Sequence, residues 1–347
     1  MLDVDFIVLV QSPPNRRNHA RTTPNLPFLP HLEEREKIMS NTIYADARED
    51  QDPLLGLLKH HLQGQTSRIW RFYAEAGDEK KAKRCEECGT FPLFELWEHL
   101  MTAERRRKLK SANFCKVRWC PTCAWLKSRK YAGEVRSILI QLEALRPVRY
   151  IFLTLTTRNV LLPELKTALK TMSRAFNRLT EMPEFKGVVL GYIRALEALG
   201  GNTQAGEAHP HFHVLLVVKP SYFSNGYITQ ARWSELWQRC LRADYVPVVD
   251  VRKVKPKCEG RTARDSGIFE TVKYIAKPQS VGSLCQKDFE ELDRQMKGVK
   301  QYTQGGVLKD FKPEKSEGFS SEEWKLIGIE FYAWAGKDYR LEKYKPV

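Results

Sequence analysis

The chain lacks the long apolar run that a membrane-spanning helix needs. None of its segments approaches roughly 18 consecutive apolar residues. The first ten residues contain FIVLV, but two aspartates and no cationic stretch come with these letters, which is unlike a secretory signal peptide. Internal repeats are also absent, which argues against solenoid and propeller folds. We therefore expect a globular cytoplasmic protein with no membrane partner.

Acidic residues are scarce relative to basic ones. The chain of 347 residues has 57 Lys and Arg against 42 Asp and Glu, a formal net charge of +15. This excess favours polyanionic partners, because neutralised phosphates release their counterions. We expect nucleic acid as the partner, although a basic excess can also serve solubility alone. Hydrophobic residues make up 42%, enough for a sizeable core.

Alternating strand and helix patterns fill the middle of the chain. The order is β-α-β-β-α-β-α, typical of an α+β fold in which helices pack on an antiparallel sheet. Strands are expected over 149–156, 187–199, 211–219 and 246–254, and helices over 163–182, 229–243 and 266–277, with Ser266 as the N-cap of the last. Further helices are expected over 93–110, 121–145 and 287–298 and near Ser321.

The segment HPHFH opens the third of these strands. Residues two apart on a strand point to the same face, so His211 and His213 project together, whereas Phe212 faces the core. Pro210 argues against regular strand at His209. Two imidazoles at this spacing can bind one divalent ion; alternatively, they are ordinary strand-edge histidines.

The preceding strand supplies an acidic residue. If the two strands pair as a hairpin, Glu197 can lie beside the two histidines as a third ligand. A His/His/Glu set suits Mn²⁺ or Mg²⁺ at a phosphate, and zinc also fits such ligands.

The helix GIFETVKYIAK carries three polar residues on one face. Glu270, Tyr274 and Lys277 are spaced by four and three residues. Tyr274 fits the role of a nucleophile towards a phosphodiester, Lys277 that of a nearby positive charge and Glu270 that of a base. Taken alone, a tyrosine on an amphipathic helix more often packs against a core.

Five of the eight cysteines lie between positions 85 and 123. Cys85 and Cys88, like Cys120 and Cys123, have the CxxC spacing of a tetrahedral zinc site. Cys115 is a fifth candidate that can replace one of the four. Reduced thiols and a redox role are the alternatives. We assign no role to Cys240, Cys258 and Cys285.

Basic residues crowd the same cysteine-rich region. They can grip DNA phosphates or form a solvated surface, and they are Arg105, Arg106, Arg107, Lys108, Lys110, Lys127, Arg129 and Lys130.

Three segments resemble the motifs of plasmid rolling-circle replication initiators, within the endonucleases named for a His-hydrophobic-His motif. These segments, in order, are FLTLTT (152–157), HPHFHVLLVV (209–218) and FETVKYIAK (269–277). The stretch KLKSANFCKVRWCPTCAW (108–125) resembles a cysteine segment of one branch of this family. The likeness covers about residues 80–310.

The resemblance implies a ferredoxin-like nicking fold and a reaction. Tyr274 would nick one strand at the double-strand origin of plasmid DNA and stay linked to the 5′ phosphate. The freed 3′ hydroxyl would prime synthesis by a host polymerase, with a host helicase and single-stranded DNA as further partners in a bacterial cytoplasm. Glu270 falls where related proteins have a second tyrosine, which implies cleavage by water at termination.

We accordingly expect four parts in the chain. These are a disordered tail (1–50), a cysteine-rich zinc-binding and helical module (51–145), a nicking endonuclease domain (146–280) and a C-terminal helical extension (281–347). Met39 offers an alternative start within the tail. A transposase or relaxase with the same chemistry, or a zinc-containing DNA-binding regulator without catalysis, are the competing functions.

Overall fold

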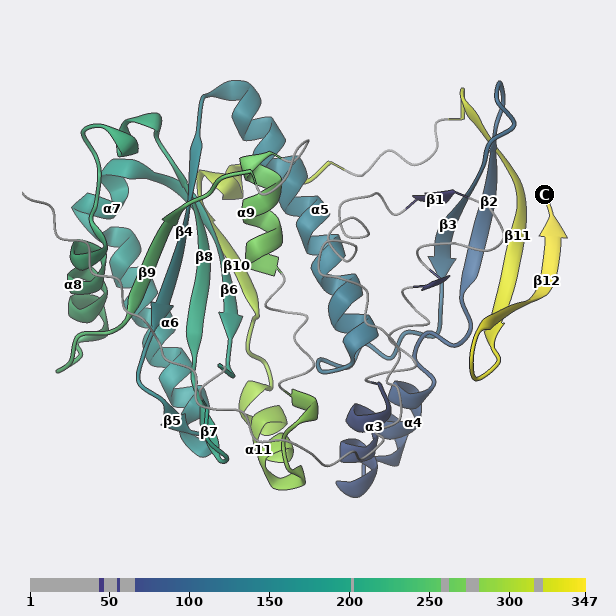
Figure 1. Ribbon diagram of the computed structural model, residues 1–347, viewed down its shortest axis with the longest axis horizontal. Coiled ribbons are helices and arrows are strands. Elements are labelled where there is room, and N and C mark those ends of the chain that lie inside the picture. Colours follow the sequence, from purple (N-terminus) through teal and green to yellow (C-terminus); the bar gives the residue numbers. More distant parts are fainter. Residues whose placement is uncertain are drawn as a thin grey trace, which may run out of the picture. The chain divides into compact units, whose positions relative to one another are not determined.

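The computed structural model describes residues 44–46, 55–56, 66–200, 203–256, 262–272, 281–314 and 321–347. These residues form a mixed α+β protein with antiparallel sheets, as the sequence predicts (Figure 1). Most of the predicted tail, together with Tyr274, Lys277 and Cys258, lies outside the described residues. The short strand β1 (Tyr44–Asp46) falls within the range predicted as tail and pairs with a strand of the cysteine-rich region.

A five-stranded sheet occupies the middle of the chain. Every neighbouring pair of its strands is antiparallel. Its order is β10 (Tyr302–Gly306), β6 (Val189–Glu197), β8 (His211–Val218), β4 (Arg149–Thr156) and β9 (Val249–Lys253). The four predicted strands are present, whereas β10 was not expected. Its partner β6 lies on the other side of the predicted boundary at residue 280.

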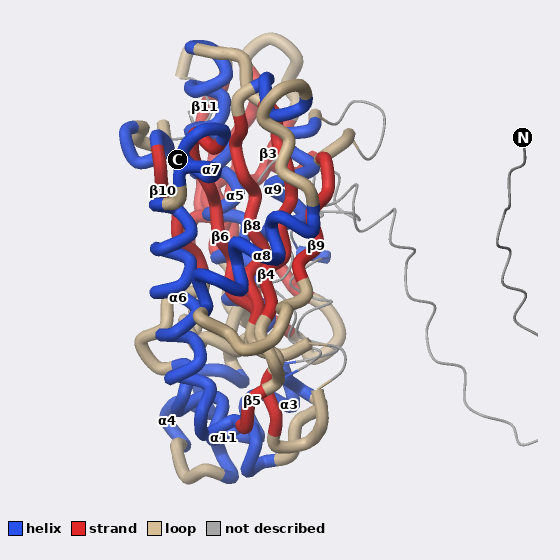
Figure 2. The backbone as a smooth tube through the Cα atoms, turned by 90° about the vertical axis from the view of Figure 1, so that its left-hand side faces the viewer, coloured by secondary structure: helices blue, strands red, loops and turns tan. Residues whose placement is uncertain are grey.

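Helices cover both faces of this sheet. The helices α6 (Leu165–Glu181) and α8 (Gln230–Leu241) lie over one face (Figure 2), and their apolar residues pack in one core with Phe212. On the opposite face, α5 (Pro121–Leu145) and α9 (Ala263–Val272) pack in a second core with Leu215. The sheet is therefore buried on both sides, which explains why all eight residues of β8 are buried.

Shorter elements connect these layers. One of them is α7 (Pro183–Val188), which occupies the start of the predicted strand at 187–199, so that β6 begins two residues after the predicted start. The other short elements are α3 (Thr66–Glu75), α4 (Glu79–Glu86), β5 (Val160–Leu161), η1 (Leu162–Glu164), β7 (Glu207–Ala208), η2 (Pro220–Phe223), α11 (Gln286–Met296) and η4 (Val307–Asp310). No helix in the described part of the chain is both long and apolar enough to cross a membrane.

A second five-stranded sheet overturns two predicted helices. The range 93–110 forms the hairpin of β2 (Leu93–His99) and β3 (Arg105–Ser111), not a helix. The chain near Ser321 leads into β11 (Trp324–Trp334), which pairs with β2 and with β12 (Tyr339–Pro346). The range 281–347 is thus not purely helical. Pairing with β11, more than 200 residues away, makes β2 a strand despite its helix-forming residues.

Candidate functional site

The register of the central sheet brings the two histidines and the glutamate together. Glu197 of β6 lies directly opposite His211 of β8, and Ala195 lies opposite His213. Directly opposed residues of antiparallel strands share a face. All three candidate ligands therefore point to the face covered by α5 and α9, whereas Phe212 is buried on the other face.

The ligand atoms converge on one point. Glu197 Oε2 lies 3.2 Å from His211 Nε2 and 3.1 Å from His213 Nε2. The exposed fractions of Glu197, His211 and His213 are only 7%, 7% and 5%. A carboxylate buried this deeply needs positive partners. Two imidazole nitrogens and one carboxylate oxygen form a set of ligand atoms that could hold a divalent ion.

Hydrogen bonds on the far side of the rings orient them. His211 Nδ1 lies 2.8 Å from the backbone oxygen of His209, so Nδ1–H donates to this carbonyl and leaves Nε2 free to bind a cation. His213 Nδ1 lies 3.4 Å from Thr154 Oγ1. Such outer contacts fix the tautomer and the direction of a metal-binding imidazole. The face therefore presents both Nε2 atoms towards Glu197.

His209 lies outside β8, which begins at His211. Its Nδ1 is 2.7 Å from Asn159 Oδ1, and its ring centre is 5.2 Å from that of His211. Burial lowers the pKa of His209, and the neighbouring His211 acts in the same direction. His209 is thus a neutral neighbour of the ligand group that contributes its carbonyl to His211.

Two further polar residues on this face were not singled out from the sequence. Thr154 lies opposite His213 on β4, and Asp250 of β9 lies opposite Thr154. Asp250 forms an ion pair with Arg252 at 2.8 Å. The sequence FLTLT could have indicated Thr154, because Thr154 and Thr156 alternate with the buried Leu153 and Leu155 and therefore face the other side of the strand.

The helix expected to carry the nucleophile starts earlier than predicted. α9 begins at Ala263, and Thr262 Oγ1 accepts a hydrogen bond from Asp265 N at 3.0 Å. Ser266 is buried inside the helix and is not its N-cap, because Thr262 performs this function. Glu270 lies in the described part of α9 and is half-buried.

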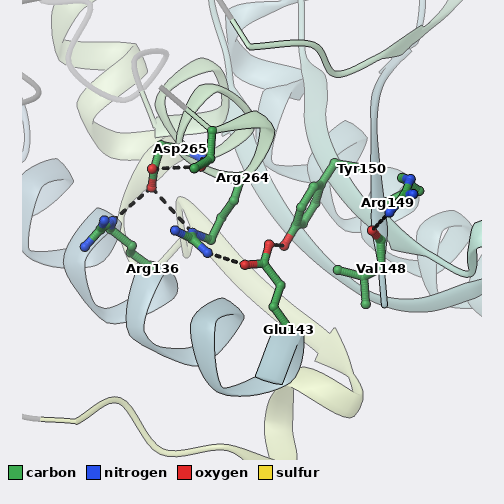
Figure 3. Close-up of polar contacts among 8 residues, drawn as sticks. Arg136, Glu143, Val148, Arg149, Tyr150, Arg264 and Asp265 are labelled. Atoms are coloured by element: carbon green, nitrogen blue, oxygen red, sulfur yellow. Dashed lines mark hydrogen bonds and ion pairs between the residues drawn. The ribbon is translucent and has the colours of Figure 1, made fainter. Parts of the chain in front are cut away.

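Ion pairs attach the start of α9 to α5 and to the sheet (Figure 3). Arg264 pairs with Glu143 of α5, and Glu143 also accepts a hydrogen bond of 2.6 Å from the Tyr150 hydroxyl. Asp265 accepts a hydrogen bond from Arg136 at 2.9 Å. These contacts place the first turn of α9 beside the start of β4.

From this anchor α9 runs along β8 towards the histidines. Tyr150, which its first turn contacts through Glu143, lies opposite Val217 near the end of β8. One turn later, Gly267 approaches Leu215 so closely that a Cβ would lie 2.6 Å from Leu215 Cδ1. The next residue of β8 on this face is His213. The helix axis therefore advances towards the ligand group.

The cysteines form a second convergent group. The sulfur of Cys123 lies 3.5 Å from that of Cys88 and 3.6 Å from that of Cys115. With Cys120, these three place all their sulfurs within 4.8 Å of one another. The four-thiol group thus contains Cys115 where the CxxC pattern places Cys85. Cys85 is fully buried beside Cys115 and Cys120.

Backbone N–H groups point at these sulfurs. Cys115 N donates to Cys88 Sγ at 3.3 Å, and Lys116 N donates to Cys123 Sγ at 3.2 Å. Lys116 adopts a φ of 58°, which lets the chain turn tightly around the cluster. Hydrogen bonds from Cys120 and Cys123 hold the pKa of the Cys115 thiol far below its usual value. Four sulfurs at these separations match the tetrahedral donor set that zinc prefers.

The three arginines of β3 form ion pairs with glutamates of the protein itself. Arg107 forms a buried ion pair with Glu330 at 2.6 Å, and Arg105 pairs with Glu98 at 2.8 Å. Arg106 pairs with Glu104 at 2.7 Å. These side chains stabilise the second sheet and offer less free charge to DNA than the sequence suggests. Of the isolated cysteines, Cys240 is buried and Cys285 is exposed.

Comparison with known proteins identifies the family. Residues 106–338 match the family model described as "Replication protein". The chain belongs to this replication protein family. It is 36% identical over 299 residues to "Protein rep" of Bacillus amyloliquefaciens, covering 79% of this chain and 83% of the relative.

"Protein rep" of Lactiplantibacillus plantarum is 36% identical over 266 residues, covering 73% of this chain and 81% of that protein. "Protein rep" of Streptococcus pneumoniae is 32% identical over 238 residues, covering 67% and 72% of the two chains. No solved structure matches this chain. The resemblance to replication proteins is confirmed, and the family region includes the histidine strand and α9 but begins after Cys85 and Cys88.

Proposed function

We propose that this replication protein initiates rolling-circle replication of a plasmid by nicking one DNA strand at the origin. The observation that carries the proposal is the convergence of His211, His213 and Glu197 on one buried point, at 3.1–3.2 Å. Three ligands with open coordination positions are typical of catalytic metal sites. Membership in the family favours an initiator over a transposase, a relaxase or a non-catalytic regulator.

A bound Mg²⁺ or Mn²⁺ would polarise the scissile phosphate and stabilise the charge that develops on it. His211, His213 and Glu197 would hold this ion. The hydrogen bond from His211 to the His209 carbonyl keeps the imidazole Nε2 unprotonated for that purpose. Thr154, in contact with His213, would orient the second ring.

Tyr274 is the proposed nucleophile. Its hydroxyl oxygen attacks the phosphorus, the bond from phosphorus to the 3′ oxygen breaks, and a 5′-phosphotyrosine forms. The tyrosine proton leaves and the 3′ oxygen gains a proton, so the product strand ends in a 3′ hydroxyl. The direction of α9 supports this role, because the helix advances along β8 towards His213 and Tyr274 follows its last described residue, Val272, by two positions. Lys277 would add positive charge near the phosphate.

The proposed partners follow from this reaction. They are double-stranded origin DNA, the single strand released by nicking, and the host helicase and DNA polymerase that extend the 3′ hydroxyl in the bacterial cytoplasm. Zinc is the ion we propose for the cysteine cluster, held by Cys88, Cys115, Cys120 and Cys123 with Cys85 beside them. The specific ferredoxin-like nicking fold is part of the same proposal.

Nicking of a supercoiled plasmid that carries the origin tests the proposal. With Mg²⁺ or Mn²⁺, the wild-type protein should convert supercoiled DNA to the open circle. Tyr274→Phe should lose this activity and keep DNA binding, because only the attacking oxygen is removed. Tyr245→Phe, whose hydroxyl contacts Thr157 and the backbone of Arg158, is a matched control that should still nick. A wild-type protein that never nicks would contradict the proposal.

Glu270 is the proposed base that activates water at termination. Glu270→Ala should leave the first nick within about threefold of wild type but slow hydrolysis of the phosphotyrosine by on the order of 10²-fold, as for a lost general base. Release of the protein from a preformed DNA adduct measures this step. Loss of the initial nick would overturn the assignment.

A further inference from the structure

A cationic pocket lies on the face of the central sheet opposite the histidines. It has a volume of about 600 Å³ and is formed by α6, β6, β10 and the segment after α11. Arg194 and Phe212 line it, and their neighbours Ala195 and His213 point to the other face. The pocket is lined by six basic side chains and no carboxylate: Lys166, Lys170, Arg174, Arg194, Lys297 and Lys300.

One wall of the pocket is a row of cations along α6. Lys166, Lys170 and Arg174 follow one another at intervals of four residues and are exposed. This spacing puts them on one side of the helix over roughly 12 Å. Lys297 and Lys300 are exposed on the segment after α11. No carboxylate among the described residues forms an ion pair with any of these five side chains, whereas the arginines of β3 are paired.

Arg194 lies deeper in the pocket. Its guanidinium carbon is 4.6 Å from the ring centre of Phe176 and 4.3 Å from that of Phe212. Nε donates to Thr303 Oγ1 at 3.1 Å, but Nη1 is buried and has no hydrogen-bond partner among the described residues. Burial lowers the pKa of Arg194 to about 10. A desolvated cation without an anion is costly to the fold, which indicates that an anionic ligand completes it.

We propose that this α6–β10 pocket binds the phosphates of single-stranded DNA. Five exposed cations spread over two walls exceed what one small phosphate can neutralise, and a flexible strand can place several phosphates there. Leu196 N donates to Gln301 O at 2.8 Å, so the β10 side of the pocket lies one residue from Glu197. A strand leaving the histidine face can therefore reach the pocket around the β10 edge. The choice of DNA rests on the proposed nicking function; the anionic chemistry of the ligand does not.

Binding of a fluorescein-labelled 16-nucleotide oligo(dT), measured by anisotropy without divalent ions, tests this pocket. The variant Lys166→Gln/Lys170→Gln/Arg174→Gln changes only exposed residues. Each phosphate contact contributes about 0.7 to the slope of log K against log [NaCl] for single strands, so three lost contacts should reduce the slope by about 2. Affinity near 0.1 M NaCl should fall at least about tenfold.

A variant of equal charge change elsewhere is the control. Lys80→Gln/Lys309→Gln/Lys325→Gln removes three exposed cations outside the pocket and should bind within about twofold of wild type. Arg194→Gln, with its folding checked by thermal unfolding, should weaken binding by a similar factor to the pocket triple variant. Equal affinities and slopes for the two triple variants would overturn the proposal.

Competition separates a DNA strand from a small phosphate ligand. Unlabelled oligo(dT) should displace the probe at micromolar concentrations, whereas thymidine 5′-monophosphate should not displace it below several millimolar. Equal competition by the monophosphate would overturn the assignment to a strand. Because no cleavage is measured, a protein that binds through this pocket but never nicks the origin would contradict the proposed function and support the pocket.

Discussion

The cysteine cluster takes its sulfurs from turns and from the start of α5, between residues 88 and 123, whereas the histidine site takes its ligands from two neighbouring strands of the central sheet. In the cluster, four sulfurs lie within 4.8 Å of one another. In the histidine site, three ligand atoms from the described residues converge, those of Glu197, His211 and His213. Sites with four protein ligands and no open coordination position are typical of structural zinc. Sites with three protein ligands and an open position are typical of catalytic metals.

The two groups also differ in what holds their ligands in place. Backbone N–H groups of Cys115 and Lys116 donate to the sulfurs, so a local turn completes the cluster. The histidine site is held by strand pairing instead, because the register of β6 and β8 places Glu197 opposite His211. The cysteine group is therefore built on a local turn, whereas the histidine group is built on the pairing of two strands.

The largest expected effect is the loss of nicking when one histidine is removed. His213→Ala should reduce the nicking rate by on the order of 10³-fold, because a metal ion contributes several kcal/mol to transition-state stabilisation. The thermal unfolding midpoint should fall, because His213 is buried beside Glu197, but the protein should stay folded at the assay temperature. His99→Ala, in β2 away from the site, is the control. If His213→Ala unfolded the protein but the folded fraction nicked normally, the site would be structural, and the contrast with the cysteines would fail.

Removing one cysteine of the cluster should mainly reduce the bound zinc and the stability of the protein. Cys120→Ser should lose bound zinc, measured by elemental analysis, and lower the free energy of unfolding by about 4 kcal/mol, the amount that a ligand at 1,000 times its Kd contributes. Cys285→Ser, at an exposed cysteine, should change neither quantity. A Cys120→Ser protein with full zinc content would show that the cluster does not use this sulfur.

The smallest effect should follow from weakening the anchor of α9. Glu143→Gln removes the α5 carboxylate that pairs with Arg264 and leaves this arginine its longer ion pair with Asp265, at 3.5 Å, which should cost about 1.5–3 kcal/mol of stability. It should also slow nicking about tenfold at temperatures well below unfolding, because α9 loses its position along β8. Glu134→Gln, in an exposed pair with Lys130 on the same helix, should change stability by less than about 0.5 kcal/mol. A loss of stability with an unchanged nicking rate would contradict the positioning role of this anchor.

Local patterns were sufficient to predict the elements around the histidine site. Apolar spacing predicts α5 and β4 with the bounds that the structure shows, and β8 to within one residue. The alternation of HFH predicts the shared face of His211 and His213. The pairing that places Glu197 beside them depends on the turn between β6 and β8. The glycines of this segment predict a turn, but they do not determine the register in which the two strands pair.

Long-range pairing could not be predicted in the same way. The residues of β2 include Leu, Glu and Trp in an order that suits a helix, and only its pairing with β11 makes it a strand. The edge strand β10 contains two glycines and gives a weak strand signal, yet it completes the sheet beside β6. The pocket at Arg194 was missed for this reason, because its walls come from segments more than 100 residues apart.

The covalent adduct tests the central claim most directly. The protein is incubated with Mg²⁺ or Mn²⁺ and an origin oligonucleotide, digested with nuclease and protease, and analysed by mass spectrometry. The account predicts a 5′-phosphate-linked nucleotide on Tyr274 that is absent from Tyr274→Phe and from His213→Ala. An adduct on another tyrosine, or nicking of the origin with no protein–DNA adduct at any stage, would contradict the account.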